Sequence, residues 1–567
     1  MRSPILLILI LCGAFLLRVI GLSDFPVGFT PDEASWGYDA YSLLKTGKDQ
    51  WGESWPLTFR SFGDFKLPLY TYLTIPSVAI FGLNEFATRL PNALVGTLAV
   101  LATYLMVTEL FRRRLSSSPI TNHQSLAIVA ALLLAISPWH MPLSRGAFEA
   151  NLTTCLLPLG VWTFLKGIDK PRWMVVSALA LGINMFSYHS ARLITPLIVG
   201  LLILNKTTLL PRSGKLRLHR GVVKYKSAIG VFGVFLILAA YTMFFGAGAR
   251  GTDIAIFNPT DNWAAVADRR YEAVLSGLPD LAARIFSNKV IYTFKTFSTN
   301  YLSYLSPQFL FTQGAGEWTY GMIPGRGVLY IVELLFILAA LGAFTKKRDK
   351  SILFIVLWIL LAPIPAALTK GPGYAGNRIS VMMPAIQIFS AYGALVLWNY
   401  IKVRFPKLRK YLLPVYLSTL LLGFAFFLED YVYHAPKHAA ENMLYGRRET
   451  IKHARSVEDQ YSTILINRSL SEPQIYVGFY TRWDPANYQN ASRDWLRYEK
   501  EGRSFVDQLG EYHLGKYVFG NTHDTKNVGK PVLLVGGIRD IPQSAKLIKE
   551  VKTIDGKTVI FIANEED

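Results

Sequence analysis

The sequence lacks most of the features that characterise soluble nucleotide-binding or disulfide-rich proteins. It has only two cysteines in 567 residues. Both of them, Cys12 and Cys155, lie inside apolar stretches, so disulfides give no information about the compartment. No Rossmann dinucleotide-binding fingerprint (a glycine-rich turn between a strand and a helix), Walker loop, zinc-type Cys/His spacing or Gly-x-Ser-x-Gly elbow is evident. We therefore expect no nucleotide cofactor and no nucleotide-linked substrate.

Acidic residues are also scarce, since 39 Asp and Glu stand against 59 Lys and Arg, for a formal net charge of +20. A chain this basic can bind nucleic acid, but here the basic residues are confined to short segments between apolar runs. That alternation is the positive-inside pattern of membrane proteins, so we expect no nucleic-acid partner. The basic segments are 112–114, 166–172, 206–226, 346–350 and 402–410.

Long uncharged runs are abundant. The chain is 51% hydrophobic with a mean hydropathy of +0.28, and its runs approach the roughly 20 apolar residues that cross a bilayer. They predict about eleven spans. The first is expected to remain as an uncleaved helix, because residues 21–24 (GLSD) are a poor signal-peptidase site. The predicted spans are 4–22, 88–110, 125–141, 150–167, 173–190, 192–206, 227–246, 327–345, 351–368, 379–400 and 411–429.

With the basic segments in the cytoplasm, the N-terminus is predicted to be cytoplasmic and two long loops, 23–87 and 247–326, to lie outside. The stretch 68–84 is apolar but short and broken by proline, and we interpret it as an interfacial or re-entrant segment. After about residue 430 the composition becomes polar, with strand-like runs and an Asp-Gly hairpin signal at residues 555–556. The predicted fold is an all-α polytopic membrane domain (1–429) followed by a small extracytoplasmic α/β domain (430–567).

Just after the first span, residues 30–39 (TPDEASWGYD) carry two adjacent carboxylates, Asp32 and Glu33. Carboxylates at a membrane boundary are costly unless they bind a cation, a proton or a substrate. The alternative is a helix start, with Pro31 in the first position and acids in the first turn.

Three further motifs follow in order: residues 51–56 (WGESWP), 62–70 (FGDFKLPLY) and 81–93 (FGLNEFATRLPNA). This order resembles the first loop of the GT-C membrane glycosyltransferases, specifically the aminoarabinose-transferase and protein O-mannosyltransferase group. The resemblance covers residues 1–110 well and extends more loosely to about residue 400. It implies inverting transfer of a sugar from a polyprenyl-phosphate donor to a protein, lipid or glycan acceptor. The predicted location is the outer face of a plasma membrane, among membrane lipids.

The resemblance also implies roles for residues of the first loop. Asp32 matches the family's catalytic carboxylate, and Glu33 would support it or help to bind a divalent metal ion. Lys66 would neutralise the donor phosphate, although Leu67 stands where the family has proline. The alternative for Lys66 is an interfacial lysine whose ammonium reaches up to the headgroups.

Later segments offer four more candidates. Glu149, after Arg145, would contact a metal or the acceptor, or else pair with Arg145 across one helical turn. His189 would bind a metal or the donor phosphate, or simply cap a helix. Arg192 and Arg378 would bind the donor phosphate.

Two other functions remain open from the sequence. A transporter or flippase for a lipid-linked saccharide would show paired repeats with broken helices near the midplane, whereas the charged candidates here lie at the outer ends of spans. A non-catalytic assembly subunit would tolerate substitution of Asp32 and Glu149. The aromatic loop 247–326 is expected to cover the acceptor site or to lie at the membrane interface.

Overall fold

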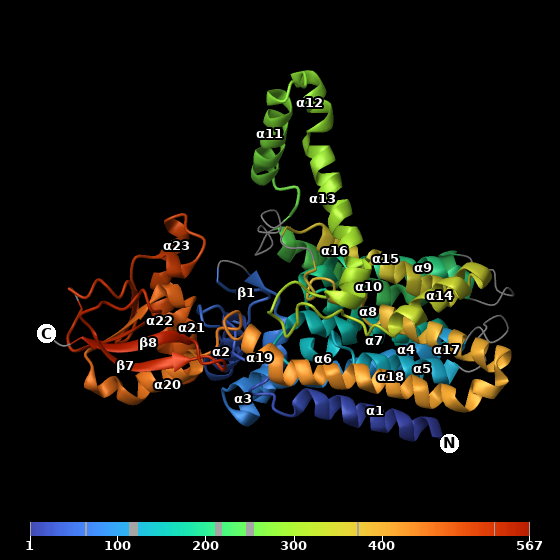
Figure 1. Cartoon of the computed structure of the whole chain (residues 1–567), viewed down its shortest axis with the longest axis horizontal. Coiled ribbons are helices and arrows are strands. Elements are labelled where there is room, and N and C mark those ends of the chain that lie inside the picture. The colour runs from blue at the N-terminus through green and yellow to red at the C-terminus, as the bar shows by residue number, and fades with distance from the viewer. Residues whose placement is uncertain are drawn as a thin grey trace.

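The chain folds into a long helical bundle with a mixed α/β unit at one end (Figure 1). The structure is a computed structural model that describes residues 2–62, 65–112, 123–209, 218–244, 255–370, 374–526 and 528–565. Several predicted features lie partly outside these residues, namely the basic segments 112–114 and 206–226, the Gly63-Asp64 turn and the glycine-rich residues 371–373.

The bundle is built mainly from eleven helices, and each coincides with one predicted span. They are α1 (Arg2–Val19), α4 (Glu85–Arg112), α5 (His123–Ala135), α7 (Leu152–Asp169), α8 (Arg172–Asn184), α9 (His189–Leu209), α10 (Leu218–Phe244), α14 (Glu333–Lys347), α15 (Lys350–Leu361), α17 (Ala385–Arg404) and α18 (Arg409–Glu429).

Within the described ranges, four helical stretches are long and apolar enough to cross a membrane: Glu85–Arg112, Tyr225–Phe244, Lys350–Ala367 and Lys410–Ala439. Shorter apolar helices accompany them, among them Pro4–Val19, His123–Ala135, Arg172–Asn184 and His189–Leu204. Large apolar side chains stay exposed along α1, α10, α14 and α18, as expected for surfaces that face lipid. The helical membrane bundle is thus confirmed, and the total of eleven crossings stays a prediction.

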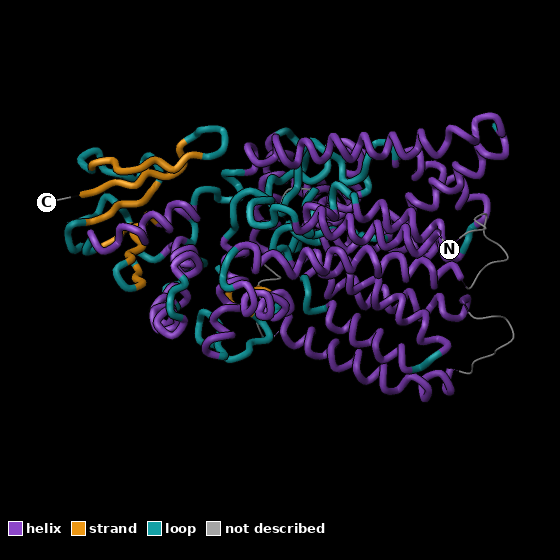
Figure 2. Tube along the Cα trace, turned by 90° about the horizontal axis from the view of Figure 1, so that it is seen from below, coloured by secondary structure: helices purple, strands orange, loops and turns teal. Residues whose placement is uncertain are grey.

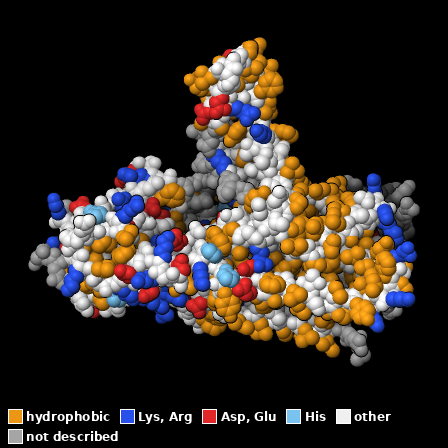
Figure 3. All heavy atoms as spheres, viewed as in Figure 1, with side chains coloured by type: hydrophobic (Ala, Val, Ile, Leu, Met, Phe, Trp, Pro, Cys, Tyr) orange, Lys and Arg blue, Asp and Glu red, His pale blue; other side chains and the backbone are white. Residues whose placement is uncertain are grey.

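The bundle helices run roughly along the long axis of the molecule in two perpendicular views (Figures 1 and 2). The N-terminus lies at the end of the bundle far from the C-terminal unit, and Lys and Arg side chains gather at that same end (Figure 3). The basic turns between α14 and α15 and between α17 and α18 carry Lys346, Lys347, Lys402 and Arg404. This segregation agrees with the predicted positive-inside arrangement.

The C-terminal unit contains a six-stranded sheet with strand order β4-β5-β3-β6-β8-β7. β3 is parallel to β5 and β6, and the remaining neighbours are antiparallel. The Asp-Gly turn does join β7 to β8, as predicted. The strands are β3 (Thr463–Asn467), β4 (Tyr512–Leu514), β5 (Tyr517–Gly520), β6 (Val532–Gly536), β7 (Lys546–Lys552) and β8 (Thr558–Glu565).

Helices cover this sheet and link it to the bundle. They are α19 (Ala435–Ala439), α20 (Arg447–Val457), α21 (Pro473–Thr481), α22 (Pro485–Trp495) and α23 (Arg497–Lys500). One hydrophobic cluster runs from the sheet through α21 into α2 (Pro31–Thr46), which follows the first span. In that cluster the rings of Phe29 and Phe479 lie 4.9 Å apart. The first loop and the C-terminal unit therefore share a core.

The two long predicted loops are both largely structured. Residues 23–87 form α2, the short strands β1 (Phe59–Arg60) and β2 (Phe65–Lys66), and α3 (Leu69–Phe81), which contains the predicted interfacial stretch. The described part of 247–326 forms α11 (Pro259–Leu275), α12 (Asp280–Phe286) and α13 (Lys289–Tyr304), which stand out from the bundle (Figure 1).

Candidate active site

The first turn of α2 positions the predicted acidic pair, and it separates the two acids. Thr30 is the N-cap: its hydroxyl accepts the Glu33 N–H at 3.3 Å, and Glu33 Oε2 accepts the Thr30 N–H at 3.1 Å. This is a capping box with proline at the start of the helix. The helix-start interpretation is therefore correct for Glu33, and it leaves the side chain of Asp32 free for another purpose.

Glu33 is fully buried in a bidentate ion pair with Arg89 of α4, which is also fully buried. Arg89 Nε lies 2.8 Å from Oε1 and Nη2 lies 3.1 Å from Oε2. The Ala147 N–H donates to Oε1 at 2.9 Å. Both carboxylate oxygens are thus occupied, and the pair joins α2 to α4 and to the turn before Glu149. This geometry suits a residue that positions its neighbour better than a metal ligand.

Asp32 faces Lys66 instead. Asp32 Oδ1 lies 2.7 Å from Lys66 Nζ, and the Asp32 side chain is 50% exposed whereas that of Lys66 is 9% exposed. Lys66 on β2 also packs its ammonium over the rings of Trp36 and Phe62, at 4.7 Å and 5.4 Å from their centroids. The alternative of a lysine that reaches for lipid headgroups is therefore wrong. Lys66 is a fixed cation beside an accessible carboxylate.

A second group of charges surrounds two tyrosines between the bundle helices. Burial raises the pKa of Tyr188 well above its usual value, with a further contribution from Glu149 and an opposing one from Arg378. The pKa of Tyr320 is likewise raised, by burial first and then by Asp32. Glu149 contributes to the pKa shift of both tyrosines, together with Arg378 at Tyr188 and Asp32 at Tyr320. The three charged residues therefore share one electrostatic neighbourhood. Arg378 Nη1 donates to Thr369 Oγ1 at 2.9 Å and also to the carbonyl of Lys370.

Arg145 and Arg192 both donate hydrogen bonds to groups of the helical bundle. Arg145 donates to the carbonyls of Leu17 and Ile20 at the end of α1, and residues 144–148 are not helical, so the helical Arg145–Glu149 pair does not form. Arg192 donates to Thr242 Oγ1 on α10 at 2.9 Å and to the carbonyl of Met185 at 3.3 Å. The guanidinium of Arg192 thus braces α8, α9 and α10.

His189 is the exposed first residue of α9, with its ring 6.4 Å from that of Tyr188. Glu149 is half-buried at the start of a short 3-10 turn, Glu149–Asn151. Among the described residues, neither belongs to a group of three His, Cys, Asp or Glu side chains close enough to hold one ion. The donor set around Tyr188 therefore falls short of a recognisable metal centre.

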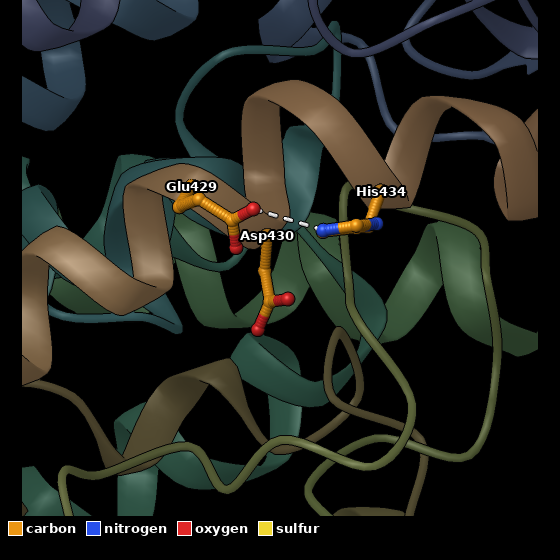
Figure 4. A group of neighbouring side chains, drawn as sticks. All are labelled: Glu429, Asp430 and His434. Carbon is orange, nitrogen blue, oxygen red and sulfur yellow. Dashed lines mark hydrogen bonds and ion pairs between the residues drawn. The ribbon is translucent and has the colours of Figure 1, made fainter.

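One such group does occur elsewhere among the described residues, and no sequence pattern predicts it. Glu429, Asp430 and His434 offer ligand atoms that all lie within 4.8 Å of one another at the end of α18 (Figure 4). However, His434 Nε2 lies 2.9 Å from Glu429 Oε1, and Asp430 forms an ion pair with Arg326. A metal ion would have to displace Arg326, so the group fits an ion-pair network better than a metal site.

The C-terminal unit contributes a carboxylate, Glu472, that is not among the residues predicted from the sequence. Glu472 precedes Pro473 at the start of α21, and it is 4% exposed with φ at 48°. Gln474 Nε2 donates to Glu472 Oε2 at 2.5 Å. Burial raises the pKa of Glu472 to about 8, with Asp507 adding to the shift and Lys66 opposing it.

Contacts along α21 explain how Glu472 reaches this neighbourhood. Tyr476 donates its hydroxyl to the Phe29 carbonyl at 2.8 Å, three residues before Asp32. Further along, Tyr38 of α2 donates to the Trp483 carbonyl at 3.0 Å. The C-terminal unit is therefore docked against the helix that carries Asp32. The only sequence signal for Glu472 is an acid before a helix-starting proline.

These features define a class: a helical membrane protein with a carboxylate–lysine pair and an arginine at the end of the bundle that bears a mixed α/β unit. The family model of the dolichyl-phosphate-mannose-protein mannosyltransferases matches residues 66–220. Over these residues the match confirms the resemblance to the protein O-mannosyltransferase group.

Several solved structures are similar to this chain at low sequence identity and with TM-scores below 0.5. The oligosaccharyltransferase of Archaeoglobus fulgidus is 14% identical with a TM-score of 0.49 and covers 84% of this chain, which spans 61% of that protein. ArnT from Cupriavidus metallidurans is 14% identical with a TM-score of 0.45, covering 98% of this chain and 97% of its own. The S. cerevisiae protein O-mannosyltransferase Pmt1-Pmt2 complex is 16% identical with a TM-score of 0.33, covering 43% and 34%. A search of curated proteins finds no match.

Proposed function

We propose that the protein is a membrane glycosyltransferase that moves a sugar from a polyprenyl-phosphate carrier to an acceptor. The observation that carries this proposal is the pair of half-exposed Asp32 and buried Lys66, 2.7 Å apart. Transfer from a sugar phosphate needs a base for the acceptor and a cation for the leaving phosphate. The pair supplies both at one point, and the matching family model is itself described by a polyprenyl-phosphate sugar donor.

In this mechanism Asp32 accepts the proton of the acceptor group as that group attacks the anomeric carbon of the sugar. The bond from that carbon to the phosphate oxygen breaks, and its electron pair leaves with the polyprenyl phosphate. Lys66 and Arg378 neutralise the departing charge. Attack opposite the leaving group inverts the anomeric centre, as the resemblance implies.

The remaining candidates have supporting roles in this proposal. Glu33 positions Asp32 by capping α2 and locking it to Arg89. Glu149, close to Tyr188, contacts the acceptor. Arg192 braces the helices around it. A divalent ion held by Glu149 and His189 would lack a third protein ligand among the described residues, so no step is derived through a metal.

The proposed side of action is the outer face of the plasma membrane, with a cytoplasmic N-terminus. Support comes from the bundle end far from the C-terminal unit, where Lys and Arg side chains gather with few acidic ones visible, whereas charges of both signs are mixed over the C-terminal unit (Figure 3). We further propose that residues 1–429 form the catalytic membrane domain, and that 430–567 form an extracytoplasmic domain docked against α2 through Tyr476.

The proposal is tested with purified protein in proteoliposomes and a panel of radiolabelled polyprenyl-phosphate sugars. The wild type should release polyprenyl phosphate, and Asp32→Asn should lower turnover by about 10²–10⁴-fold through loss of the general base. Asp24→Asn is the matched control, because Asp24 is an exposed acid on the same loop and its carboxylate pairs with Arg448 across 3.3 Å. Wild-type-like turnover by Asp32→Asn would contradict the proposal.

A further inference from the structure

Helices α11, α12 and α13 form an arm that leaves the bundle and points across, not along, the membrane-crossing helices (Figure 1). The arm is a folded unit of its own. Arg270 of α11 donates to the Ser287 carbonyl at 3.0 Å, and the Lys289 ammonium lies 5.5 Å from the centre of the Trp263 ring. Val266 and Ala283 are buried inside it.

The surface of α12 and α13 is strongly apolar. Leu281 is 77% exposed and Val290 is 78% exposed, values unusual for large aliphatic side chains that face water. On α13 the exposed Val290 and Phe294 are one helical turn apart, so they share a face. The exposed apolar side chains of this surface are Leu281, Ile285, Phe286, Val290, Ile291, Phe294 and Leu302. We call this set the α12–α13 face.

The attachment of the arm fixes its height along the bundle. Tyr301 donates its hydroxyl to the Leu360 carbonyl at 2.7 Å, one residue before α15 ends, and Asn300 donates to the Ala367 carbonyl at 3.4 Å. The apolar helical stretch Lys350–Ala367 begins at the basic end of the bundle and has 18 residues, about 27 Å of helix, so Ala367 lies near the opposite membrane boundary. The arm thus leaves at the level where lipid headgroups begin.

The candidate spans run along the bundle, so we take the bundle axis as the direction normal to the bilayer. An arm that points across this axis then runs along the membrane plane. Figure 3 shows hydrophobic atoms along the edge of the arm above the bundle, where α13 runs, and exposed hydrophobic atoms on the adjoining bundle surface. The apolar face of the arm therefore continues the surface that the bundle offers to lipid. α11 is more mixed: it exposes charged side chains of both signs, such as Arg269 and Glu272, beside the apolar Tyr271 and Leu275.

We propose that the arm is an interfacial amphipathic hairpin whose α12–α13 face is embedded in the headgroup–acyl boundary at the C-terminal end of the bundle. Amphipathic helices bind there by burying one apolar face while the polar face remains in water. α13 then continues to Tyr304, which is 2% exposed and whose pKa is raised by burial and lowered in part by nearby Arg378. The arm would hold Tyr304 and the nearby Arg378 at the depth of a lipid phosphate.

The inference is tested by site-specific fluorescence in a Cys12→Ser/Cys155→Ser background reconstituted into phosphatidylcholine vesicles. Single cysteines replace Leu281 and Phe294 on the α12–α13 face, and Glu272 on α11 serves as the matched exposed control. Each is labelled with an environment-sensitive dye and challenged with a shallow doxyl-labelled lipid or with aqueous iodide. We expect at least threefold stronger lipid quenching at positions 281 and 294 than at 272, and the reverse order with iodide.

Equal iodide quenching at all three positions would overturn the inference, because the arm would then project into water. Protection from iodide without lipid quenching would also overturn it and would indicate a second copy or another protein on this face. An unchanged Tm for each labelled variant establishes that the fold is retained. No sugar transfer is measured, so this outcome is independent of the proposed catalytic function.

Discussion

The buried pair of Glu33 and Arg89 gives the sharpest way to separate structure from chemistry in the acidic motif. Asp32 and Glu33 are neighbours in sequence, yet Asp32 is half-exposed while Glu33 is fully buried. Replacement of Glu33 by Gln leaves the Arg89 guanidinium buried without a counter-charge. Breaking a buried pair on one side costs about 3–5 kcal/mol.

Arg89 has further hydrogen-bond acceptors, which keep its guanidinium buried even when Glu33 is replaced. It donates to the carbonyls of Leu22, Pro26 and Gly28 at 3.2, 3.0 and 2.7 Å. These bonds hold the guanidinium in place after the carboxylate is lost, so the charge cannot escape to water. We therefore expect Glu33→Gln to lower the Tm by several degrees, and Asp32→Asn, at a half-exposed position, to leave it nearly unchanged.

The assay is a double-mutant cycle of Glu33→Gln and Arg89→Met in detergent, read by Tm and by reversible unfolding. The coupling free energy should be about 2–3 kcal/mol, since the second substitution removes the uncompensated charge. Turnover per folded molecule should fall far less for Glu33→Gln than for Asp32→Asn. A coupling below about 0.5 kcal/mol, or equal loss of turnover per folded molecule in both single variants, would refute this division of roles.

Three further predictions follow from the contacts around the site. Lys66→Met should reduce kcat/KM for the polyprenyl-phosphate donor by about 10²–10³-fold, with partial recovery in Lys66→Arg; steady-state kinetics that show no donor dependence would contradict a phosphate role. Arg378→Gln should raise the donor KM. Arg192→Gln should instead lower Tm through loss of the hydrogen bond to Thr242 and leave the donor KM within about twofold, roughly 0.4 kcal/mol. A donor KM raised by Arg192→Gln but not by Arg378→Gln would make Arg192 the phosphate ligand. Since the pKa of Glu472 is raised from 4.5 to about 8 on folding, the folded state binds this proton more tightly, so the associated stability is present below about pH 4.5 and is lost as the pH rises through about 8. Glu472→Gln should therefore gain Tm over the wild type as the pH rises from 5 to about 9, and a difference that does not change with pH, as for the exposed control Glu501→Gln, would exclude this titration.

Local patterns in the sequence were sufficient for the helical framework. Each predicted span coincides with a helix, because apolar runs bounded by Lys and Arg are local signals. The hairpin at Asp555-Gly556 was predicted for the same reason. For the arm, the sequence predicts only a loop rich in aromatic residues. Val290 and Phe294 are nevertheless four residues apart, the spacing that places two side chains on one face of a helix.

Contacts between distant segments could not be predicted in the same way. Which of two adjacent acids points inward depends on where Arg89 lies, and successive helical residues point about 100° apart. The approach of Glu472 to Lys66 depends on the docking of α21 against α2, through Tyr476 and Phe29. No pattern within either segment encodes that partner, so the carboxylate from the C-terminal unit appeared only in the folded structure.

The most direct test of the account compares donor binding and donor consumption by Asp32→Asn in the same proteoliposomes. If Asp32 is the base while Lys66 and Arg378 hold the phosphate, the variant should bind the polyprenyl-phosphate sugar with a Kd within about threefold of the wild type, less than 1 kcal/mol, and fail to release polyprenyl phosphate. Release at the wild-type rate, or a failure to bind the donor in a protein of unchanged Tm, would contradict the account.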